Sequence, residues 1–339
     1  MQPFFVPFKC PEYPPIKSAL PFSLFNYTFG SSGSIAPGLR LMKKFNFRFT
    51  TLLLAAVLCF FSIHSSAQKL IPLPNFKPSW VQEYKPFRIA GNLYYVGSYD
   101  LACYLITTTQ GHILINTGLP GSDTMIRRHV EELGFKFSDI RILLTNQVHF
   151  DHVGGFAAIK KMTGAQVIIQ EMDAPVLADG GNSDYLMGGH GLIFQPVKAD
   201  RLLHDRDTIS LGDMQVVVLH HPGHTKGSCS FLFDVKDQTR TYRILIANIP
   251  TLLDDTKFPG MPTYPHAEKD YAYTLDAMKK LQFDLWFAAH ASQFDLDKKH
   301  KQSDGYHPEA FADRAGYDKA IGDCYQDYLK RLDKKISTP

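Results

Sequence analysis

The sequence has 339 residues, with 36 Lys and Arg, 33 Asp and Glu, and a formal net charge of +3. Part of this excess lies in a basic N-terminal segment and the other basic residues are scattered, so the charge gives no case for a nucleic-acid partner. Three of the 5 cysteines follow that segment, and this odd number does not indicate a disulfide framework.

Residues 42–67 have the pattern of a secretory signal peptide. A basic stretch opens with Met42, an apolar run follows over 52–63, and small residues occupy 65–67. We expect cleavage after Ala67, which makes the mature chain periplasmic and starts it at Gln68. The apolar run is shorter than the roughly 20 residues of a membrane span, and no Cys follows it, which argues against an uncleaved anchor and against a lipoprotein. Residues 1–41 are expected to be disordered, or to be a non-native extension that is absent from the natural product because translation begins at Met42.

About 270 residues follow, which suits a single α/β domain over 68–339. Residues 69–86 contain several prolines and predict an extended arm, and the glycine-rich residues 180–191 predict a mobile loop. Strands are predicted at 87–90, 93–97, 102–107, 112–116, 140–144, 166–170, 197–203, 207–211, 215–220, 229–235, 242–249 and 284–289, and helices at 122–133, 156–162, 174–177, 267–281 and 308–335. This order, strands and then helices, twice over, predicts two facing sheets with helices outside, a four-layer αββα sandwich.

The densest polar cluster follows the apolar strand 140–144 and reads Thr-Asn-Gln-Val-His-Phe-Asp-His over 145–152. His149, Asp151 and His152 lie within four residues of one another, and the amide of Gln147 lies two positions upstream. Packing alone rarely needs this density of metal-ligating side chains. Zinc takes imidazole nitrogen and carboxylate oxygen, and three protein ligands with an open position make a catalytic site.

Two further histidines come directly after predicted strands. His224 follows the strand 215–220, where Gly223 permits a turn back over the sheet edge, and His290 follows the apolar run 285–289. A single histidine at a strand end is more often a surface or core residue. Together with the first cluster, these two supply enough ligands for two metal ions. His220 and His221 stay ambiguous, with structural roles favoured.

These motifs resemble those of the metallo-β-lactamase superfamily, and most closely the class B enzymes of subclass B3. The resemblance covers roughly residues 87–332 and rests on Leu-Ile-Asn-Thr-Gly at 114–118, the cluster at 145–152, Pro-Gly-His-Thr at 222–225, Pro-Thr-Tyr-Pro-His at 262–266, and His290. The usual family motif is His-x-His-x-Asp-His, and Gln147 replaces its first histidine. Asn116 replaces a common Asp. Both departures are similar to the GOB type, as is the run Ala-Gly-Asn-Leu-Tyr-Tyr-Val-Gly at 90–97.

The resemblance implies two zinc sites, the first held by Gln147, His149 and His224 and the second by Asp151, His152 and His290. A carboxamide oxygen is a weaker zinc ligand than imidazole, so we expect the second site to fill first and to carry most of the catalysis at limiting metal. The implied reaction is hydrolysis of the β-lactam amide of penicillins, cephalosporins and carbapenems by a zinc-bound hydroxide that Asp151 orients, which confers antibiotic resistance.

The sequence indicates the residues that contact the substrate less clearly than it indicates the metal ligands. By the same resemblance, Ile249 and Thr251 occupy positions where other B3 enzymes often have serines, and only Thr251 keeps a hydrogen-bonding side chain, so we expect it to contact substrate. Trp80 and the loop 180–191 are expected to border the cleft. A β-lactam is the expected partner, no obligate protein partner is expected, and a monomer is the default.

Two alternatives remain. One is another hydrolase of the same fold, a glyoxalase-II-type thioesterase or an acyl-homoserine lactonase. Those enzymes commonly place a bridging Asp where this chain has Asn248, and no carboxylate follows here until Asp254. The predicted leader also suits an enzyme that meets antibiotics outside the cytoplasm. The other alternative is a zinc-binding protein without catalysis, which would need a closed ligand set.

Overall fold

A computed structural model describes residues 69–73, 76–238, 240–258 and 261–336, which belong to one compact unit spanning 66–339. The predicted extension 1–41, the signal peptide and its cleavage site lie outside the described residues and stay predictions. Among the described residues, no helix combines the length and the apolar character needed to cross a membrane.

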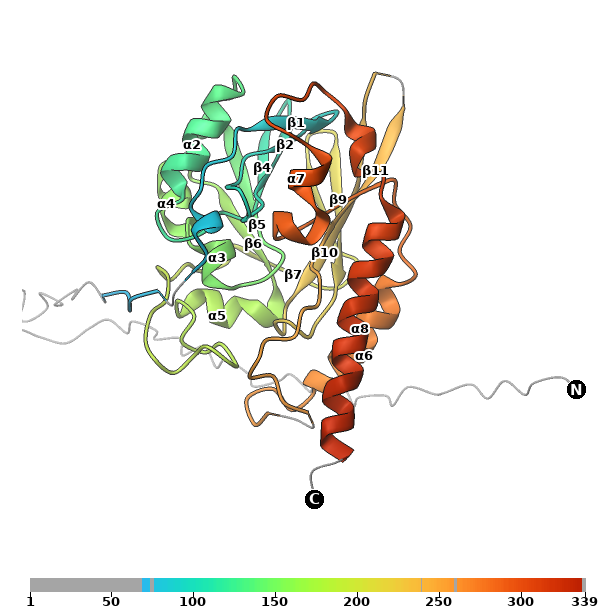
Figure 1. The fold of residues 1–339 in the computed structure, drawn as a ribbon. Helices are drawn as coiled ribbons and strands as arrows, with labels where there is room; N and C mark the ends of the chain where they lie inside the picture. Colours follow the sequence, from blue (N-terminus) through green and yellow to red (C-terminus); the bar gives the residue numbers. More distant parts are fainter. Residues whose placement is uncertain (1–68, 74–75, 239, 259–260, 337–339) are drawn as a thin grey trace, which may run out of the picture. The chain divides into compact units, whose positions relative to one another are not determined.

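Two β-sheets form the centre of the unit (Figure 1). The first has seven strands in the order β1 to β7: β1 (Phe87–Ala90), β2 (Leu93–Tyr95), β3 (Tyr104–Thr108), β4 (Gly111–Ile115), β5 (Ile140–Leu144), β6 (Gln166–Gln170) and β7 (Arg201–Leu203). The second has five strands in the order β12-β11-β10-β9-β8: β8 (Thr208–Leu211), β9 (Met214–His220), β10 (Cys229–Lys236), β11 (Thr241–Ala247) and β12 (Leu285–Ala288).

Helices cover the outer faces of both sheets. In Figure 1, α2 (Asp123–Glu132) and α4 (Phe156–Thr163) lie beside the first sheet, and α6 (Ala267–Met278) and α8 (Arg314–Ile336) lie beside the second. Three shorter helices occupy the connections: α3 (Phe150–Val153), α5 (Ala174–Ala178) and α7 (Leu296–Lys299). The predicted αββα sandwich is confirmed.

The alternation of side chains along the first sheet explains the layering. On β3, Tyr104 and Ile106 point into the core shared with the second sheet, whereas Leu105, like Cys103 just before the strand, points into the core beneath α2 and α4. Successive side chains of a strand face opposite sides, so a strand buried on both faces is apolar throughout. The continuous apolar runs in the sequence therefore belong to strands in the middle of four layers.

Strand direction brings the polar loops to one edge of the sandwich. Strands β4 to β7 are parallel, and β9, β11 and β12 of the second sheet also share one direction. The residues that follow β5, β9 and β12 include the cluster at 145–152, His224 and His290. The carboxyl ends of these three strands present the polar residues at neighbouring positions.

Several element predictions differ from the structure. The strand expected over 197–203 is paired only at Arg201–Leu203, and the helix expected over 308–335 begins at Arg314 after the 3-10 turn Pro308–Phe311. The Asp313 carboxylate accepts a hydrogen bond of 2.8 Å from the Gly316 amide, which caps that helix start. The arm 69–86 contains the 3-10 turn Pro78–Trp80, and the helix α3 inside the metal-ligand motif was not predicted.

Phe231 on β10 is 1% exposed in the core shared by the two sheets. Phe231→Ala should lower the free energy of unfolding by about 3–5 kcal/mol, because it leaves a cavity that the packed sheets cannot close. Tyr273→Ala on α6 is the control, since that side chain is 52% exposed and should change stability by less than about 0.5 kcal/mol. Denaturant unfolding of both variants measures this, and equal losses would contradict the placement of the core.

Candidate metal centre

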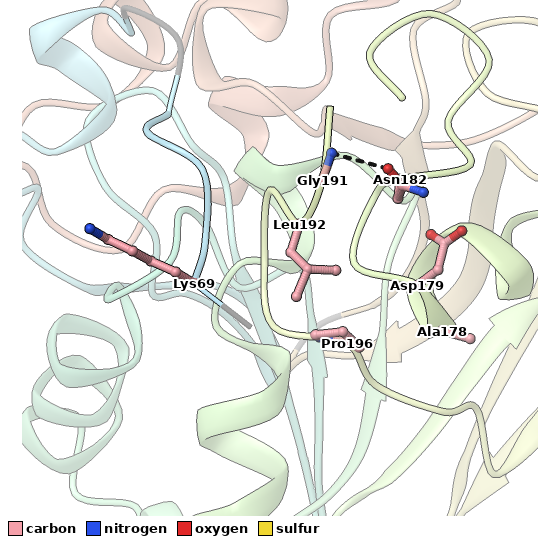
Figure 2. Close-up of a pocket in the computed structure, with 7 residues that line it drawn as sticks. All are labelled: Lys69, Ala178, Asp179, Asn182, Gly191, Leu192 and Pro196. Atoms are coloured by element: carbon pink, nitrogen blue, oxygen red, sulfur yellow. Dashed lines mark hydrogen bonds between the residues drawn. The ribbon is translucent and has the colours of Figure 1, made fainter. Parts of the chain in front are cut away.

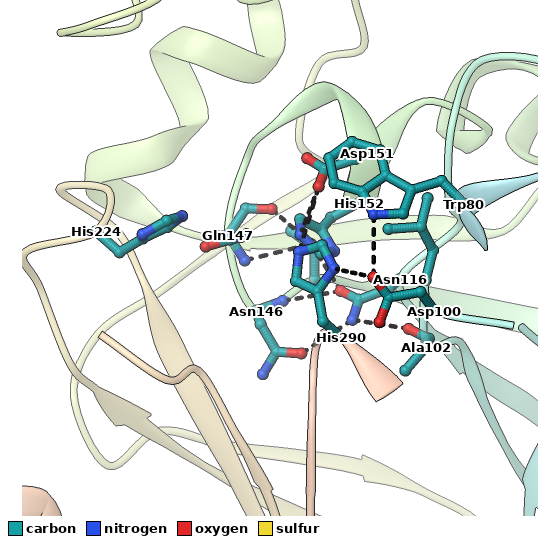
Figure 3. Close-up of polar contacts among 12 residues, drawn as sticks. Trp80, Asp100, Ala102, Asn116, Asn146, Gln147, Asp151, His152, His224 and His290 are labelled. Atoms are coloured by element: carbon teal, nitrogen blue, oxygen red, sulfur yellow. Dashed lines mark hydrogen bonds and ion pairs between the residues drawn. The ribbon is translucent and has the colours of Figure 1, made fainter. Parts of the chain in front are cut away.

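Asp151, His152 and His290 form a cluster at the edge where β5 and β12 end (Figure 3). Asp151 and His152 lie in the single turn of α3, whose N-cap residue is His149, and His290 lies two residues beyond the end of β12. The Oδ2 atom of Asp151 is 3.3 Å from Nε2 of His152 and 3.4 Å from Nε2 of His290. One ligand atom from each of the three residues lies within 4.8 Å of the others, which is close enough to share one cation.

The second predicted set lies beside the first. The His149 and His224 rings are 4.9 Å apart between centroids, at an interplanar angle of 65°. Gln147, two residues before His149, is 4% exposed and comes from the same loop. The structure therefore brings together all six residues that the sequence predicted, in two neighbouring groups; their roles as ligands stay a prediction.

Three of the four imidazoles direct one ring nitrogen at an oxygen outside the cluster. The pairs are Nε2 of His149 with Oδ2 of Asp184 at 3.3 Å, Nδ1 of His224 with the Thr251 carbonyl at 2.7 Å, and Nδ1 of His290 with Oδ2 of Asp100 at 3.6 Å. Histidines that bind metals commonly have such a partner for the other nitrogen, which fixes the ring and its tautomer. The remaining nitrogens are left for a metal.

Four buried atoms in the cluster have no hydrogen-bond partner among the described residues. They are Oε1 of Gln147, Nε2 of His149 and both ring nitrogens of His152; the two Nε2 atoms approach Asp184 and Asp151 without hydrogen-bond geometry. Buried polar atoms are nearly always paired, because an unpaired one costs roughly 1–3 kcal/mol. A cation in each of the two groups would give Oε1 of Gln147 and Nε2 of His152 a partner, so the donor sets fit metal ions.

Electrostatics favour a cation at this point. Burial raises the pKa of Asp151, but His152 and His290 lower it further, so that its pKa lies well below the usual range. Burial lowers the pKa of His290, and Asp100 and Asp151 more than reverse this, raising it to about 9. Burial and the neighbouring His149 lower the pKa of His224 to about 3. The cluster thus combines an anionic carboxylate with a neutral imidazole at His224, a suitable metal ligand.

Asp173 fixes the positions of the two loops that carry the first set. Its Oδ2 accepts hydrogen bonds from the Val148 amide at 3.0 Å and the Thr225 hydroxyl at 2.7 Å, and its Oδ1 accepts one from the Gly227 amide at 2.7 Å. It is 2% exposed, and its carboxylate thereby links the loop of His149 to the loop of His224.

Gly223 is required by its backbone. Its φ of 139° lies in the region that favours glycine, and a Cβ there would come within 3.0 Å of the Tyr271 ring. The Tyr271 hydroxyl donates to the Thr251 carbonyl at 3.1 Å, the same carbonyl that accepts from Nδ1 of His224. The turn predicted at Gly223 therefore packs against Tyr271, one of the largest fully buried side chains among the described residues. Tyr271 in turn bonds the carbonyl that orients the His224 imidazole.

Thr251, Trp80 and the loop 180–191 all lie at the cluster. The Thr251 hydroxyl is 3.2 Å from Nδ1 of His224, and the Trp80 ring is 5.5 Å from the His290 ring between centroids. The loop contributes Asp184. The supporting carboxylates could not be predicted from the sequence, because no spacing motif connects a single Asp to a histidine far away in the chain. These residues are Asp100, Asp173 and Asp184.

The glycine-rich loop also borders a different cavity, of about 500 Å³, lined by Lys69, Ala178, Asp179, Asn182, Gly191, Leu192 and Pro196 (Figure 2). Gly191 donates to Oδ1 of Asn182 at 3.1 Å, and the Ile71 amide donates to the Leu192 carbonyl at 2.8 Å, which ties the N-terminal arm to the loop. None of the predicted site residues lines this cavity, so it is separate from the cluster.

Residues 101–290 match the Metallo-beta-lactamase superfamily. The chain belongs to this superfamily. Among solved structures, a β-lactamase from Chitinophaga pinensis is 61% identical with a TM-score of 0.77, and the match covers 78% of this chain and 100% of that one. The class B3 di-zinc metallo-β-lactamase LRA-12 from an Alaskan soil metagenome is 58% identical with a TM-score of 0.75, over 78% and 99% of the two chains.

The metallo-β-lactamase GOB-18 from Elizabethkingia meningoseptica is 50% identical, with a TM-score of 0.78, and the match covers 79% of this chain and 100% of that one. The predicted resemblance to subclass B3 and to the GOB type is confirmed. Matches to curated relatives are shorter and span between 34% and 64% of those proteins. One of them is an acyl-coenzyme A thioesterase of Gallus gallus, 32% identical over 26% of this chain and 35% of its own length.

Asp184→Asn should weaken metal binding at the Gln147, His149 and His224 group by about 10- to 100-fold, because the amide no longer supplies the negative charge beside Nε2 of His149. Asp179→Asn is the matched control, since this carboxylate lines the cavity of Figure 2 instead. Zinc dissociation constants from competition with a chromophoric chelator measure the effect. Equal constants for Asp184→Asn and wild type would contradict it.

Proposed function

We propose that this protein is a zinc-dependent β-lactamase that hydrolyses the amide bond of the β-lactam ring. The observation that carries the proposal is the group of Asp151, His152 and His290, which offers a cation one carboxylate and two imidazoles at a sheet edge. The similarity to the B3 enzymes supports the choice of zinc and of the β-lactam substrate.

Each metal position would have its own set of ligands. Gln147, His149 and His224 would hold one zinc ion, and Asp151, His152 and His290 the other. The first set is neutral and includes a carboxamide, whereas the second contains an anionic carboxylate. We expect the second to bind more tightly, because charge attraction adds to coordination.

Zinc, when bound, supplies a Lewis acid that makes water a nucleophile near neutral pH and polarises the lactam carbonyl. The Asp151 carboxylate, which is 6% exposed, is an acceptor that would orient the attacking water and hold its proton. Asp184, Asp100 and the Thr251 carbonyl keep three imidazoles in fixed orientations, so the donor atoms need not rearrange during the reaction. No serine or cysteine nucleophile is needed.

Several finer properties belong to the same proposal. Thr251 would contact the substrate near His224. The substrates would include penicillins, cephalosporins and carbapenems. The protein would act in the periplasm as a monomer and would confer antibiotic resistance.

Asn248 favours this function over a lactonase or a thioesterase of the same fold. It directly follows β11, is 1% exposed, and stands where those enzymes commonly have a bridging Asp. An amide is neutral and offers a single oxygen, so it does not replace a carboxylate between two cations.

A chelator should abolish hydrolysis of a chromogenic cephalosporin and of a carbapenem by the purified 68–339 chain, and added zinc should restore it. Asp151→Asn should lower kcat by at least about 100-fold, because it removes the negative charge and replaces one of the two acceptor oxygens that orient the water by an NH2 donor. Asp213→Asn, at the exposed turn between β8 and β9, is the control and should keep full activity.

Acyl-homoserine lactone and acyl-coenzyme A should stay intact under the same conditions. Zinc-loaded protein that cleaves either of these and leaves every β-lactam intact would overturn the proposed function in favour of the lactonase or thioesterase.

A further inference from the structure

We propose that Trp80 of the N-terminal arm is a positioning residue for the Asp151, His152 and His290 metal site and acts on His290 through Asp100. The inference rests on the proposed metal centre but not on the identity of its substrate. Trp80, Asp100 and His290 come from three distant parts of the chain and meet behind the cluster (Figure 3).

The indole N–H of Trp80 makes a direct contact with Asp100. Its Nε1 donates to Oδ2 of Asp100 at 3.1 Å, and the Ser292 amide donates to Oδ1 at 2.9 Å. Each carboxylate oxygen therefore has a fixed donor, and the Ser292 side chain also hydrogen-bonds to this carboxylate. Oδ2, the oxygen held by Trp80, is also the one that lies 3.6 Å from Nδ1 of His290. The Trp80 N–H thus determines where the negative charge behind His290 is placed.

The backbone of Asp100 is already attached to the segment of His290. The Ala291 amide donates to the Asp100 carbonyl at 2.7 Å, the Ala102 amide donates to the Ala289 carbonyl at 3.0 Å, and Leu101 pairs with His290 in a β-bridge. These bonds do not depend on the arm. What the arm adds is a donor that orients the Asp100 side chain, which is 6% exposed.

Main-chain hydrogen bonds in turn hold the 3-10 turn of Trp80 in place. The Asp100 amide donates to the Ser79 carbonyl at 3.2 Å, and the Tyr99 amide donates to the Gln82 carbonyl at 2.8 Å. Trp80 is therefore fixed to the strand connection that carries Asp100, and the arm is part of the site's support.

The indole ring has a second role that is separable from its N–H. It lies 5.5 Å from the His290 ring and 6.2 Å from the Phe150 ring between centroids, and covers an imidazole that is still 19% exposed. Phenylalanine at position 80 would keep an aromatic ring there and remove only the donor. Trp80→Phe therefore isolates the contact with Asp100.

The test is zinc binding, measured by competition with a chromophoric chelator on wild type, Trp80→Phe, Asp100→Asn and the double variant. We expect Trp80→Phe to weaken the tighter site about 10-fold and Asp100→Asn to weaken it at least as much, the range typical of groups that orient metal ligands. The double variant should be no weaker than Asp100→Asn alone, because the two changes affect one path. The weaker site should keep its affinity in all variants.

Val81→Ala is the matched control, because this neighbour of Trp80 in the arm is 55% exposed and its side chain has no polar atom. An unchanged zinc affinity in Trp80→Phe, with only KM raised, would overturn the inference and leave Trp80 as a wall of the substrate cleft. Full additivity in the double variant would also overturn it. Since the readout is metal affinity, failure of β-lactam hydrolysis would contradict the proposed function and leave this inference standing.

Discussion

The buried side-chain amide of Asn146, which pairs with that of Asn116, joins the two sheets beneath the proposed metal centre. Nδ2 of Asn116 donates to Oδ1 of Asn146 at 3.0 Å, and Nδ2 of Asn146 donates across to the carbonyls of Cys229 on β10 and Ile246 on β11, at 3.0 and 3.3 Å. Both side chains are 0% exposed, so every one of these groups would cost free energy if left unpaired. Because the proposed ligands follow strands of both sheets, the metal centre would depend on this connection.

The same network gives a physical reason for the asparagine at position 116. Its φ of 63° is left-handed, a conformation that asparagine tolerates better than most residues. Its oxygen accepts from the Thr145 hydroxyl at 2.9 Å and the Asn146 amide at 3.1 Å, while its nitrogen donates to the Ala102 carbonyl at 3.3 Å. A carboxylate would offer only acceptors. Asparagine at position 116, where the family commonly has Asp, thus supplies the N–H donor that the side-chain oxygen of Asn146 accepts.

Near the Asn116 and Asn146 contact, carboxylates and a carbonyl outside the proposed ligand set hold the imidazole rings in place. Asp184, Asp100 and the Thr251 carbonyl each face one histidine, and Asp173 ties the two loops that carry His149 and His224. Fixing the donors before the metal arrives reduces the ordering cost of binding, and it also limits which geometries the ligands offer. Gln147, whose carboxamide would be the weaker ligand, lies in the same loop as His149 among these fixed groups.

Much of the fold and the ligand set could be predicted from the sequence, because both depend on local patterns. Apolar runs predicted β1, β5 and β6 with their bounds, and the spacing of His149, Asp151 and His152 indicated the centre. The supporting residues could not be found this way. Asp100 and His290 are 190 positions apart, and the partner of each carboxylate is set by how strands and loops meet in space. Likewise α3 is a single turn, too short to show a helical period.

The most direct test of the account is a crystal structure of the 68–339 chain with one equivalent of zinc, read by anomalous scattering at the zinc edge. We expect one strong peak bound by Asp151, His152 and His290, at distances of about 2.0–2.2 Å. A peak bound by Gln147, His149 and His224 instead, or no peak at either group, would contradict it.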